Sequence, residues 1–212
     1  MTTREHWDKT YADRAADQGA TMPIAGWFYD LLMKPLGWLG LDRLRRRLVG
    51  SARGRTLEIG VGTGLNLDLY EPSAAPLVAL DVDRAGLLRA HRRVSRALLV
   101  QASVEALPFR DGVFNTVVSC LVFCSVPNPA AGLDEVHRVL NASGELMMLE
   151  HVRPAGRFLG WLADRLTPMW SRLAGGCRLN RRTAQALEPA GFRPSPPGRL
   201  LRDAVLELRA RR

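Results

Sequence analysis

Short apolar runs alternate with helical patterns along most of the chain. The apolar runs predict strands at residues 56–60, 77–81, 98–101, 114–120, 145–150 and 203–209. Between them, helices are predicted near residues 64–70, 84–94, 129–139 and 181–190. A further strand near residues 192–196 is doubtful because Pro194, Pro196 and Pro197 interrupt it. The alternation predicts an α/β fold, with helices on both faces of a mostly parallel sheet.

Two segments lie outside this alternation. Residues 1–50 are predicted to form a helical N-terminal cap, in which a Trp-rich run at 27–39 precedes the arginines of 43–47. That arrangement fits either a helix packed on the sheet or an amphipathic segment at a membrane surface. Residues 154–180 form an insertion whose large apolar residues recur at helical spacing. Since ligands bind beyond the carboxyl ends of strands in such folds, this insertion is predicted to cover a substrate site, within one domain spanning residues 1–212.

The most informative chemistry lies at residues 56–64, where a buried-strand pattern runs into three glycines at every second position. Glycines there allow a tight turn and a close approach of a ligand to the main chain. Glu58 precedes the first glycine by two positions, and its carboxylate would repel a pyrophosphate but suit an ammonium group. Asp81 ends the next strand and suits a bidentate grip on ribose hydroxyls. A dinucleotide site, which uses G-x-G-x-x-G, and a turn without a ligand are the alternatives.

Several longer segments carry a family resemblance. Residues 107–118 read L-P-F-R-D-G-V-F-N-T-V-V, residues 135–145 read E-V-H-R-V-L-N-A-S-G-E, and residues 187–192 read L-E-P-A-G-F. In this order, and together with the glycine turn, they resemble the class I S-adenosylmethionine (AdoMet) methyltransferases. The resemblance implies a Rossmann-like, seven-stranded, mostly parallel sheet with one antiparallel strand near the C-terminus. Asn115 departs from the usual Asp, and Ser103 stands where an acid often contacts the adenine amino group.

The resemblance also implies roles for individual residues. The methionine end of AdoMet is expected at Glu58, Asn66 and the turn, and the ribose at Asp81. Val82 is expected to flank the adenine, with Ser103 and Val104 at its edge. Backbone around Cys120 and Leu121 is expected beside the methionine moiety. The turn residues in this set are Gly60, Val61, Gly62, Thr63 and Gly64.

Glu150 and His151 are the predicted catalytic residues, because they end the strand at 145–150 on the substrate side. Imidazole accepts a proton near neutral pH, so His151 could take one from a thiol, amine or hydroxyl. The alternative is a hydrogen-bonded structural pair that fixes the exit of the insertion. Cys120 and Cys124, in the segment that follows the fourth strand, are predicted to be inert buried side chains.

The segments C-L-V-F-C-S-V at 120–126, E-H-V at 150–152 and G-C-R-L-N-R at 176–181 narrow the resemblance. They are similar to a methyltransferase-like group that includes alkyl-thiol methyltransferases and bacterial phosphatidylethanolamine N-methyltransferases. A small lipophilic acceptor, such as a thiol or a lipid headgroup, is therefore expected. Phospholipid N-methylation, quinone-type C-methylation and a non-enzymatic AdoMet-binding module remain as rivals.

The net charge of +9 is concentrated near the C-terminus. Residues 153–212 carry 13 basic and 4 acidic residues, whereas residues 1–152 carry 17 of each. This surplus suits an anionic membrane surface or simply a solvated face, and the helical pattern around its tryptophans argues against nucleic acid. No apolar run of membrane-spanning length or signal-peptide pattern occurs, and the three cysteines lack zinc-site spacing. We therefore expect a cytoplasmic protein without a metal, with peripheral membrane binding as an open alternative and an oligomeric state that the sequence leaves undefined.

Overall fold

One sheet organises the computed structural model, which describes residues 40–93, 96–200 and 204–212. Its strand order is β3-β2-β1-β4-β5-β8-β6, and β7 also pairs with β8. Because β6 and β7 pair with different parts of β8, the eight strands fill seven positions, which confirms the predicted architecture. The strands are β1 (Thr56–Ile59), β2 (Leu77–Asp81), β3 (Leu98–Gln101), β4 (Phe114–Cys120), β5 (Leu140–His151), β6 (Arg193–Pro194), β7 (Gly198–Leu200) and β8 (Val205–Arg211).

The first five strands are parallel, and β8 runs antiparallel to β5. The proline-rich segment after residue 192 does form strands, but only the short edge pieces β6 and β7. An edge position suits proline because proline offers no N–H to a second neighbouring strand. The predicted strands are otherwise confirmed, although β5 starts five residues earlier than predicted and β8 is shifted toward the C-terminus.

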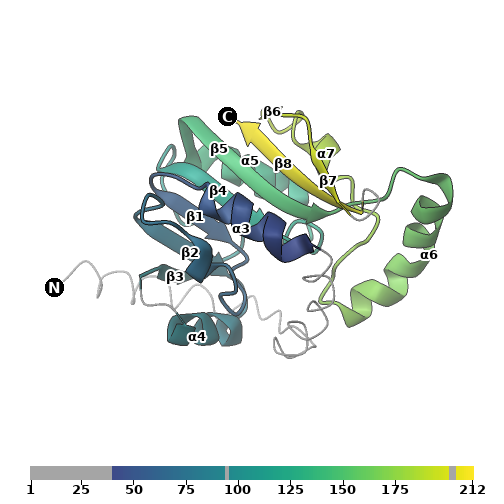
Figure 1. Ribbon diagram of the computed structural model, residues 1–212, viewed down its shortest axis with the longest axis horizontal. Coiled ribbons are helices and arrows are strands. Elements are labelled where there is room, and N and C mark those ends of the chain that lie inside the picture. Colours follow the sequence, from purple (N-terminus) through teal and green to yellow (C-terminus); the bar gives the residue numbers. More distant parts are fainter. Residues whose placement is uncertain (1–39, 94–95, 201–203) are drawn as a thin grey trace.

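Helices cover both faces of the sheet (Figure 1). On one face, α3 (Asp42–Gly50) and α4 (Arg84–Arg93) bury Leu48 and Leu87 in a core shared with Met147. On the other face, α5 (Pro129–Val139) and α7 (Thr183–Ala186) border a core that contains Leu133 and Met148. Neighbouring residues of β5 thus enter opposite cores, as the period of two in a strand requires.

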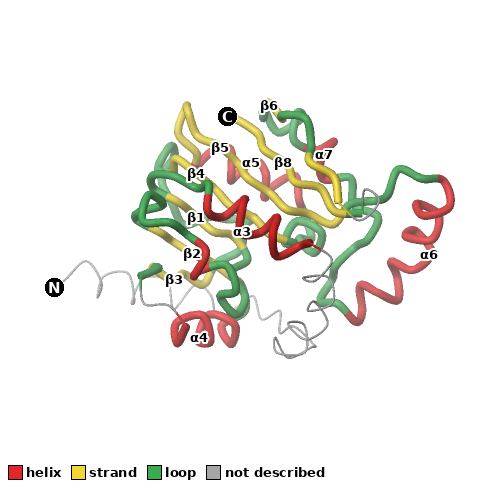
Figure 2. Tube along the Cα trace, viewed as in Figure 1, coloured by secondary structure: helices red, strands yellow, loops and turns green. Residues whose placement is uncertain are grey.

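The helix α6 (Arg157–Leu173) does not cover either face of the sheet. It stands beyond the end of the sheet at which β5 finishes, as the tube in Figure 2 shows most clearly. This helix is the main element of the predicted insertion at residues 154–180.

Two predicted helices are much shorter than expected. Residues 64–70 form only a 3₁₀ turn, Leu67–Leu69. The Asn66 side chain makes no capping hydrogen bond at its start, and the backbone is already extended at Tyr70, shortly before Pro72. Residues 181–190 contain only the four-residue helix α7, followed by turns. Of the predicted N-terminal cap, residues 1–39 lie outside the described residues, and α3 is its described part.

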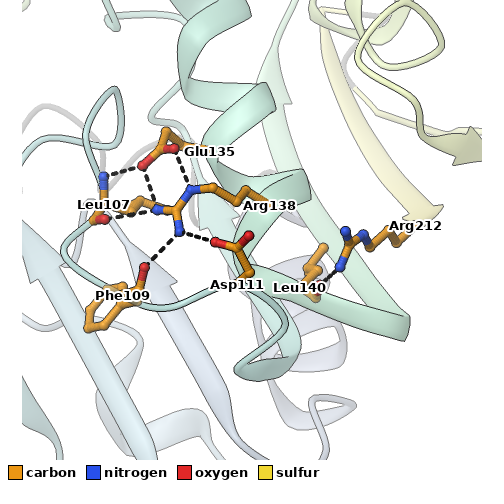
Figure 3. A network of polar contacts seen from close by, with 7 residues as sticks. All are labelled: Leu107, Phe109, Asp111, Glu135, Arg138, Leu140 and Arg212. Carbon is orange, nitrogen blue, oxygen red and sulfur yellow. Dashed lines mark hydrogen bonds and ion pairs between the residues drawn. The ribbon is translucent and has the colours of Figure 1, made fainter.

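Arg138 joins two of the motifs that carried the family resemblance (Figure 3). Its guanidinium donates to both carboxylate oxygens of Glu135, to Asp111, and to the backbone carbonyl oxygens of Leu107 and Phe109, at 2.7–3.0 Å. Glu135 also accepts from the Leu107 N–H at 2.7 Å. These contacts hold the loop before β4 against α5, so the motifs are structural rather than catalytic.

Candidate active site

The glycine turn follows β1 at the carboxyl edge of the parallel strands. Gly60, Gly62 and Gly64 all have positive φ angles, of 67°, 52° and 85°. A Cβ on Gly60 would lie 2.4 Å from Val122 Cγ2, so tight packing requires glycine there. A Cβ on Gly62 would meet none of the described residues within 4 Å. With respect to the described part of the chain, the Gly62 backbone can therefore be approached by a ligand.

Glu58 is completely buried in β1 on the face covered by α3. Its Oε1 accepts a hydrogen bond from Asn66 Nδ2 at 2.8 Å. Among the described residues, Glu58 Oε2 and Asn66 Oδ1 are buried without a hydrogen-bond partner. Burial raises the pKa of Glu58 to about 7, against the lowering effect of the Asn66 hydrogen bond. The buried Tyr70 hydroxyl lies near Glu58 and also lowers its pKa. Because each of these oxygens can accept more than one hydrogen bond, the pair is still suited to a ligand that donates hydrogen bonds.

Asp81, at the end of β2, braces the turn. Its Oδ2 accepts from the Gly62 N–H at 2.7 Å, and its Oδ1 accepts from the Asp83 N–H at 2.9 Å. Burial raises its pKa, and the backbone hydrogen bonds oppose that effect. Each carboxylate oxygen can accept a second bond, so the proposed ribose contact is compatible with the bracing role.

The predicted adenine-side residues lie in two different environments. Val82 is exposed and follows Asp81 directly. Ser103 is half-buried, and its hydroxyl donates to Glu105 Oε2 at 3.3 Å. The Val104 side chain is buried in the core, so only its backbone is available to a ligand. The contacts of all three with a cofactor stay predictions.

The predicted Cys120 is the last residue of β4, and the predicted Leu121 begins the loop after it. Leu121 has a φ of 60°, an uncommon left-handed conformation for a non-glycine residue. Its N–H donates to the Leu149 carbonyl oxygen at 2.7 Å, which fixes this conformation at the strand end. Burial, and then the negative charge of Glu58, raise the pKa of the Cys120 thiol.

Glu150 is completely buried beneath the same loop. Its Oε1 accepts from Ser119 Oγ and from the N–H groups of Val122 and Phe123, at 3.0–3.1 Å. Its Oε2 accepts from the Cys124 N–H at 3.2 Å. Burial raises its pKa to about 7 in spite of these bonds. This geometry agrees with the structural alternative for Glu150, because the carboxylate is used to hold the loop.

His151 is half-buried at the last position of β5 and meets a cysteine pair. Its Nδ1 lies 3.9 Å from Cys177 Sγ, and Cys177 forms an apolar cluster with Cys124 and Ala174. Hydrogen bonding from the Cys124 thiol, followed by His151, lowers the pKa of Cys177. Three segments distant in sequence therefore bring two cysteines and an imidazole together at the end of the sheet.

Comparisons with known proteins identify the family. The family model described as "Methyltransferase domain" matches residues 57–148. Thiol S-methyltransferase TMT1B from Rattus norvegicus is 32% identical over 194 residues, which cover 82% of this chain and 79% of that protein. The chain belongs to the class I AdoMet-dependent methyltransferases. Phosphatidylethanolamine N-methyltransferase from Cereibacter sphaeroides is 35% identical over 109 residues, which cover 49% of this chain and 53% of that protein.

A solved structure shares the fold of this methyltransferase. The crystal structure of an AdoMet-dependent methyltransferase from Mesorhizobium loti superimposes with a TM-score of 0.61, at 20% identity. The superposition covers 82% of this chain and all of the other. At that identity the likeness concerns the fold alone.

The cofactor is AdoMet, and the residues at the turn fit it. Glu58 Oε2 and Asn66 Oδ1 are unpaired acceptors for an ammonium group, and the space over Gly62 admits a ligand to the backbone. Among the described residues, no group of three or more His, Cys, Asp or Glu is arranged to hold a metal ion. The described helices also include none that is long and apolar enough to cross a bilayer.

Two residues of the site were not predicted from the sequence. Arg45 was treated as one of several outward arginines, but its side chain is 14% exposed and its charge lowers the pKa of Glu58. Its Nε is buried without a hydrogen-bond partner among the described residues, so it suits the carboxylate of the methionine moiety. Cys177 was part of a motif that carried the resemblance and was given no role of its own. No spacing in the sequence relates Cys177 to His151, since the contact joins positions 26 residues apart through the insertion.

Proposed function

We propose that this methyltransferase acts on a small lipophilic acceptor that binds between the β4–α5 loop and the segment containing α6 and Cys177. The observation that carries this proposal is the orientation of α6. Its small residues Gly160, Ala163 and Thr167 are buried, whereas Phe158, Trp161 and Met169 are 70%, 56% and 57% exposed. A helix that directs its large apolar side chains away from its own core is suited to apolar ligands or lipid.

The proposed chemistry needs alignment more than acid–base strength. AdoMet supplies an electrophilic methyl carbon on a sulfonium centre. The acceptor atom must lie in line with the carbon–sulfur bond that breaks, so positioning and water exclusion contribute most of the rate. In this proposal Glu58, Asn66 and Arg45 hold the methionine end, and Asp81 holds the ribose.

His151 is the proposed proton acceptor for thiol, amine or hydroxyl acceptors. It lies at the carboxyl end of β5, and the neighbouring strand β4 ends at Cys120 beside the glycine turn. Cys177 lies within contact distance of the imidazole and is proposed to orient it. Glu150 is assigned a positioning role, because its carboxylate holds the Val122 to Cys124 backbone that would face the acceptor.

A turnover screen tests the proposal. Labelled AdoMet would be incubated with the protein and with alkyl thiols, aminolipids, phenols and quinones of matched hydrophobicity. Methylation of at least one lipophilic class, and no turnover of its water-soluble analogue, is the expected result. AdoMet binding without turnover of any class would favour the non-enzymatic alternative.

A lipid headgroup is the second candidate acceptor. Arg157 and Arg165 lie on α6 with the exposed apolar residues, and an apolar surface flanked by arginine suits an anionic membrane. The proposal that the protein binds peripherally to such a surface follows from this arrangement. An aminophospholipid in vesicles, offered in the same screen, distinguishes headgroup methylation from thiol methylation.

A further inference from the structure

A cationic cavity lies next to the Cys124–Cys177 contact. It has a volume of about 280 Å³ and is bounded by the β4–α5 loop on one side and by the end of α6 and the following loop on the other. Three of the seven described lining residues are arginines and none is acidic. The lining residues are Ser125, Pro127, Ser171, Arg172, Gly176, Arg178 and Arg181.

These three arginines lack the carboxylate partners found elsewhere in the same region. Arg153 is paired with Asp164 at 2.8 Å. Within the described part of the chain, Arg172, Arg178 and Arg181 take part in no ion pair. Like charges gathered without a counter-charge repel one another, so the arrangement is most favourable when an anion is bound.

Arg181 shows the need for an anion most directly. Its Nη2 donates to the Val126 carbonyl oxygen at 2.6 Å, which fixes the guanidinium, and its Nε is buried without a partner among the described residues. Burial, and then the nearby charge of Arg178, lower the pKa of Arg181. A fixed guanidinium with an unused donor is typical of a binding site rather than of a solvated surface.

Backbone contacts hold the walls of the cavity in place. The Arg178 N–H donates to the Cys124 carbonyl oxygen at 2.9 Å, and the Gly176 N–H donates to Ser171 at 2.8 Å. The Arg153 N–H donates to the Arg181 carbonyl oxygen at 2.8 Å. The arginines are therefore mounted on a braced loop, so less entropy is lost when they bind a ligand.

We propose that Arg172, Arg178 and Arg181 form a phosphate-binding subsite, and that the methyl acceptor carries the phosphate. Guanidinium groups match the oxygens of a phosphate in charge and geometry, and three of them suit a doubly charged group better than a single carboxylate. Ser125 lines the cavity and directly follows Cys124. The Cys124 thiol interacts with Cys177, whose sulfur lies 3.9 Å from His151 Nδ1. A phosphate held there would direct the rest of the acceptor toward His151, so this inference rests on the proposed function.

Calorimetric and NMR titrations without AdoMet test the subsite directly. The probes are inorganic phosphate and a short-chain phosphatidic acid below its micelle concentration, at constant ionic strength set with chloride. Saturable binding is expected, together with a shifted Nε–H signal of Arg181. Arg172→Gln and Arg178→Gln should each weaken binding by about tenfold or more, because both side chains are exposed and their loss should leave the fold intact.

Arg92→Gln is the control, since it removes an exposed arginine of α4 that lies outside the cavity. Binding that does not saturate, or that Arg92→Gln weakens equally, would overturn the subsite. Equal affinity for inorganic phosphate and phosphatidic acid would contradict the proposal that the methyl acceptor carries the phosphate. The site would then be one for free phosphate. AdoMet affinity and turnover are measured on the same variants, so that a failure of the phosphate subsite can be told apart from a failure of the proposed function. Normal turnover without phosphate binding would contradict only the subsite.

Discussion

The two sides of the site differ in charge and in exposure. At the ends of β1 and β5, Glu58 and Glu150 are completely buried, and their oxygens hold Asn66 and the loop after β4. On the proposed acceptor side, arginines and large apolar side chains face outward from α6 and the loop after it. The ends of the strands, where AdoMet is proposed to bind, are therefore fixed by buried hydrogen bonds. The part proposed to select the acceptor is instead built on a surface element, where substitution disturbs less of the core.

The largest expected effect concerns the buried carboxylates and pH. Burial raises the pKa of Glu58 and Glu150 to about 7, above the value of an exposed glutamate, so the folded state holds more protons than the unfolded state. Each therefore contributes stability that is present at low pH and is lost as pH rises toward 7. Between pH 5 and 7 the unfolding free energy of Glu150→Gln should fall less steeply with pH than that of the wild type, by about 1 kcal/mol per pH unit.

Urea unfolding at pH 5, 6, 7 and 8 measures this slope in the wild type and the variant. The pKa of Cys177 is lowered, so its contribution to stability changes with pH in the opposite direction. Because Cys177 is present in both proteins, this contribution cancels when the two slopes are subtracted. Parallel slopes in the two proteins would show that Glu150 does not titrate in this range.

The second prediction concerns His151. If His151 accepts the proton of the acceptor, His151→Ala should lower kcat by about 10²-fold and leave AdoMet affinity nearly unchanged. Single-turnover kinetics with the acceptor found in the screen, from pH 6 to 9, provide the measurement. His137→Ala, which removes a histidine of α5 that packs on Phe192, is the control. A kcat within a few-fold of the wild type at every pH would leave His151 with a structural role only.

The third prediction separates ligand approach from backbone conformation. Gly62→Ala and Gly112→Ala both place a side chain at positive φ, and neither Cβ would meet an atom closer than 3.9 Å. Both should lose about 1–2 kcal/mol of stability, but only Gly62→Ala should weaken AdoMet binding, by about tenfold or more. Thermal unfolding and calorimetry provide the two measurements. If both variants bind AdoMet like the wild type, the space over Gly62 is not part of the cofactor site.

The smallest expected effect concerns the membrane. Leu173 on α6 and Leu88 on α4 are 55% and 53% exposed, so the pair is matched in residue type and exposure. Leu173→Ser should reduce co-sedimentation with anionic vesicles by about three- to tenfold, because its burial in lipid would be lost, whereas Leu88→Ser should not. Binding should also weaken between 0.1 and 1 M salt, as the Debye length falls from about 10 Å to about 3 Å. If the wild type does not bind vesicles, the basic C-terminal segment is a solvated surface and not a membrane-binding one.

The positions of the strands along the chain, the glycine turn and the cofactor class were accessible from the sequence. Apolar runs define strands locally, and Glu58, the three glycines and Asp81 lie on β1, β2 and their connection, where short spacing fixes their relative positions. The helix predicted at 64–70 was wrong because Asn66 uses its side chain on Glu58, a contact across the turn that helical periodicity does not register.

Only the tertiary structure shows the surroundings of the polar residues near the end of β5. By its position in the sequence Glu150 is a catalytic candidate, but its buried carboxylate accepts four hydrogen bonds, from Ser119 and from the backbone of the loop after β4. Cys177 contacts His151 of β5, and Arg181 donates to the Val126 carbonyl oxygen in the β4–α5 loop. Both partners are far away along the chain. The sequence determined the local conformations and therefore the fold and cofactor. Long-range packing determined which charges are buried, paired or left without a partner, because burial and partnership depend on segments that only the folded chain brings together.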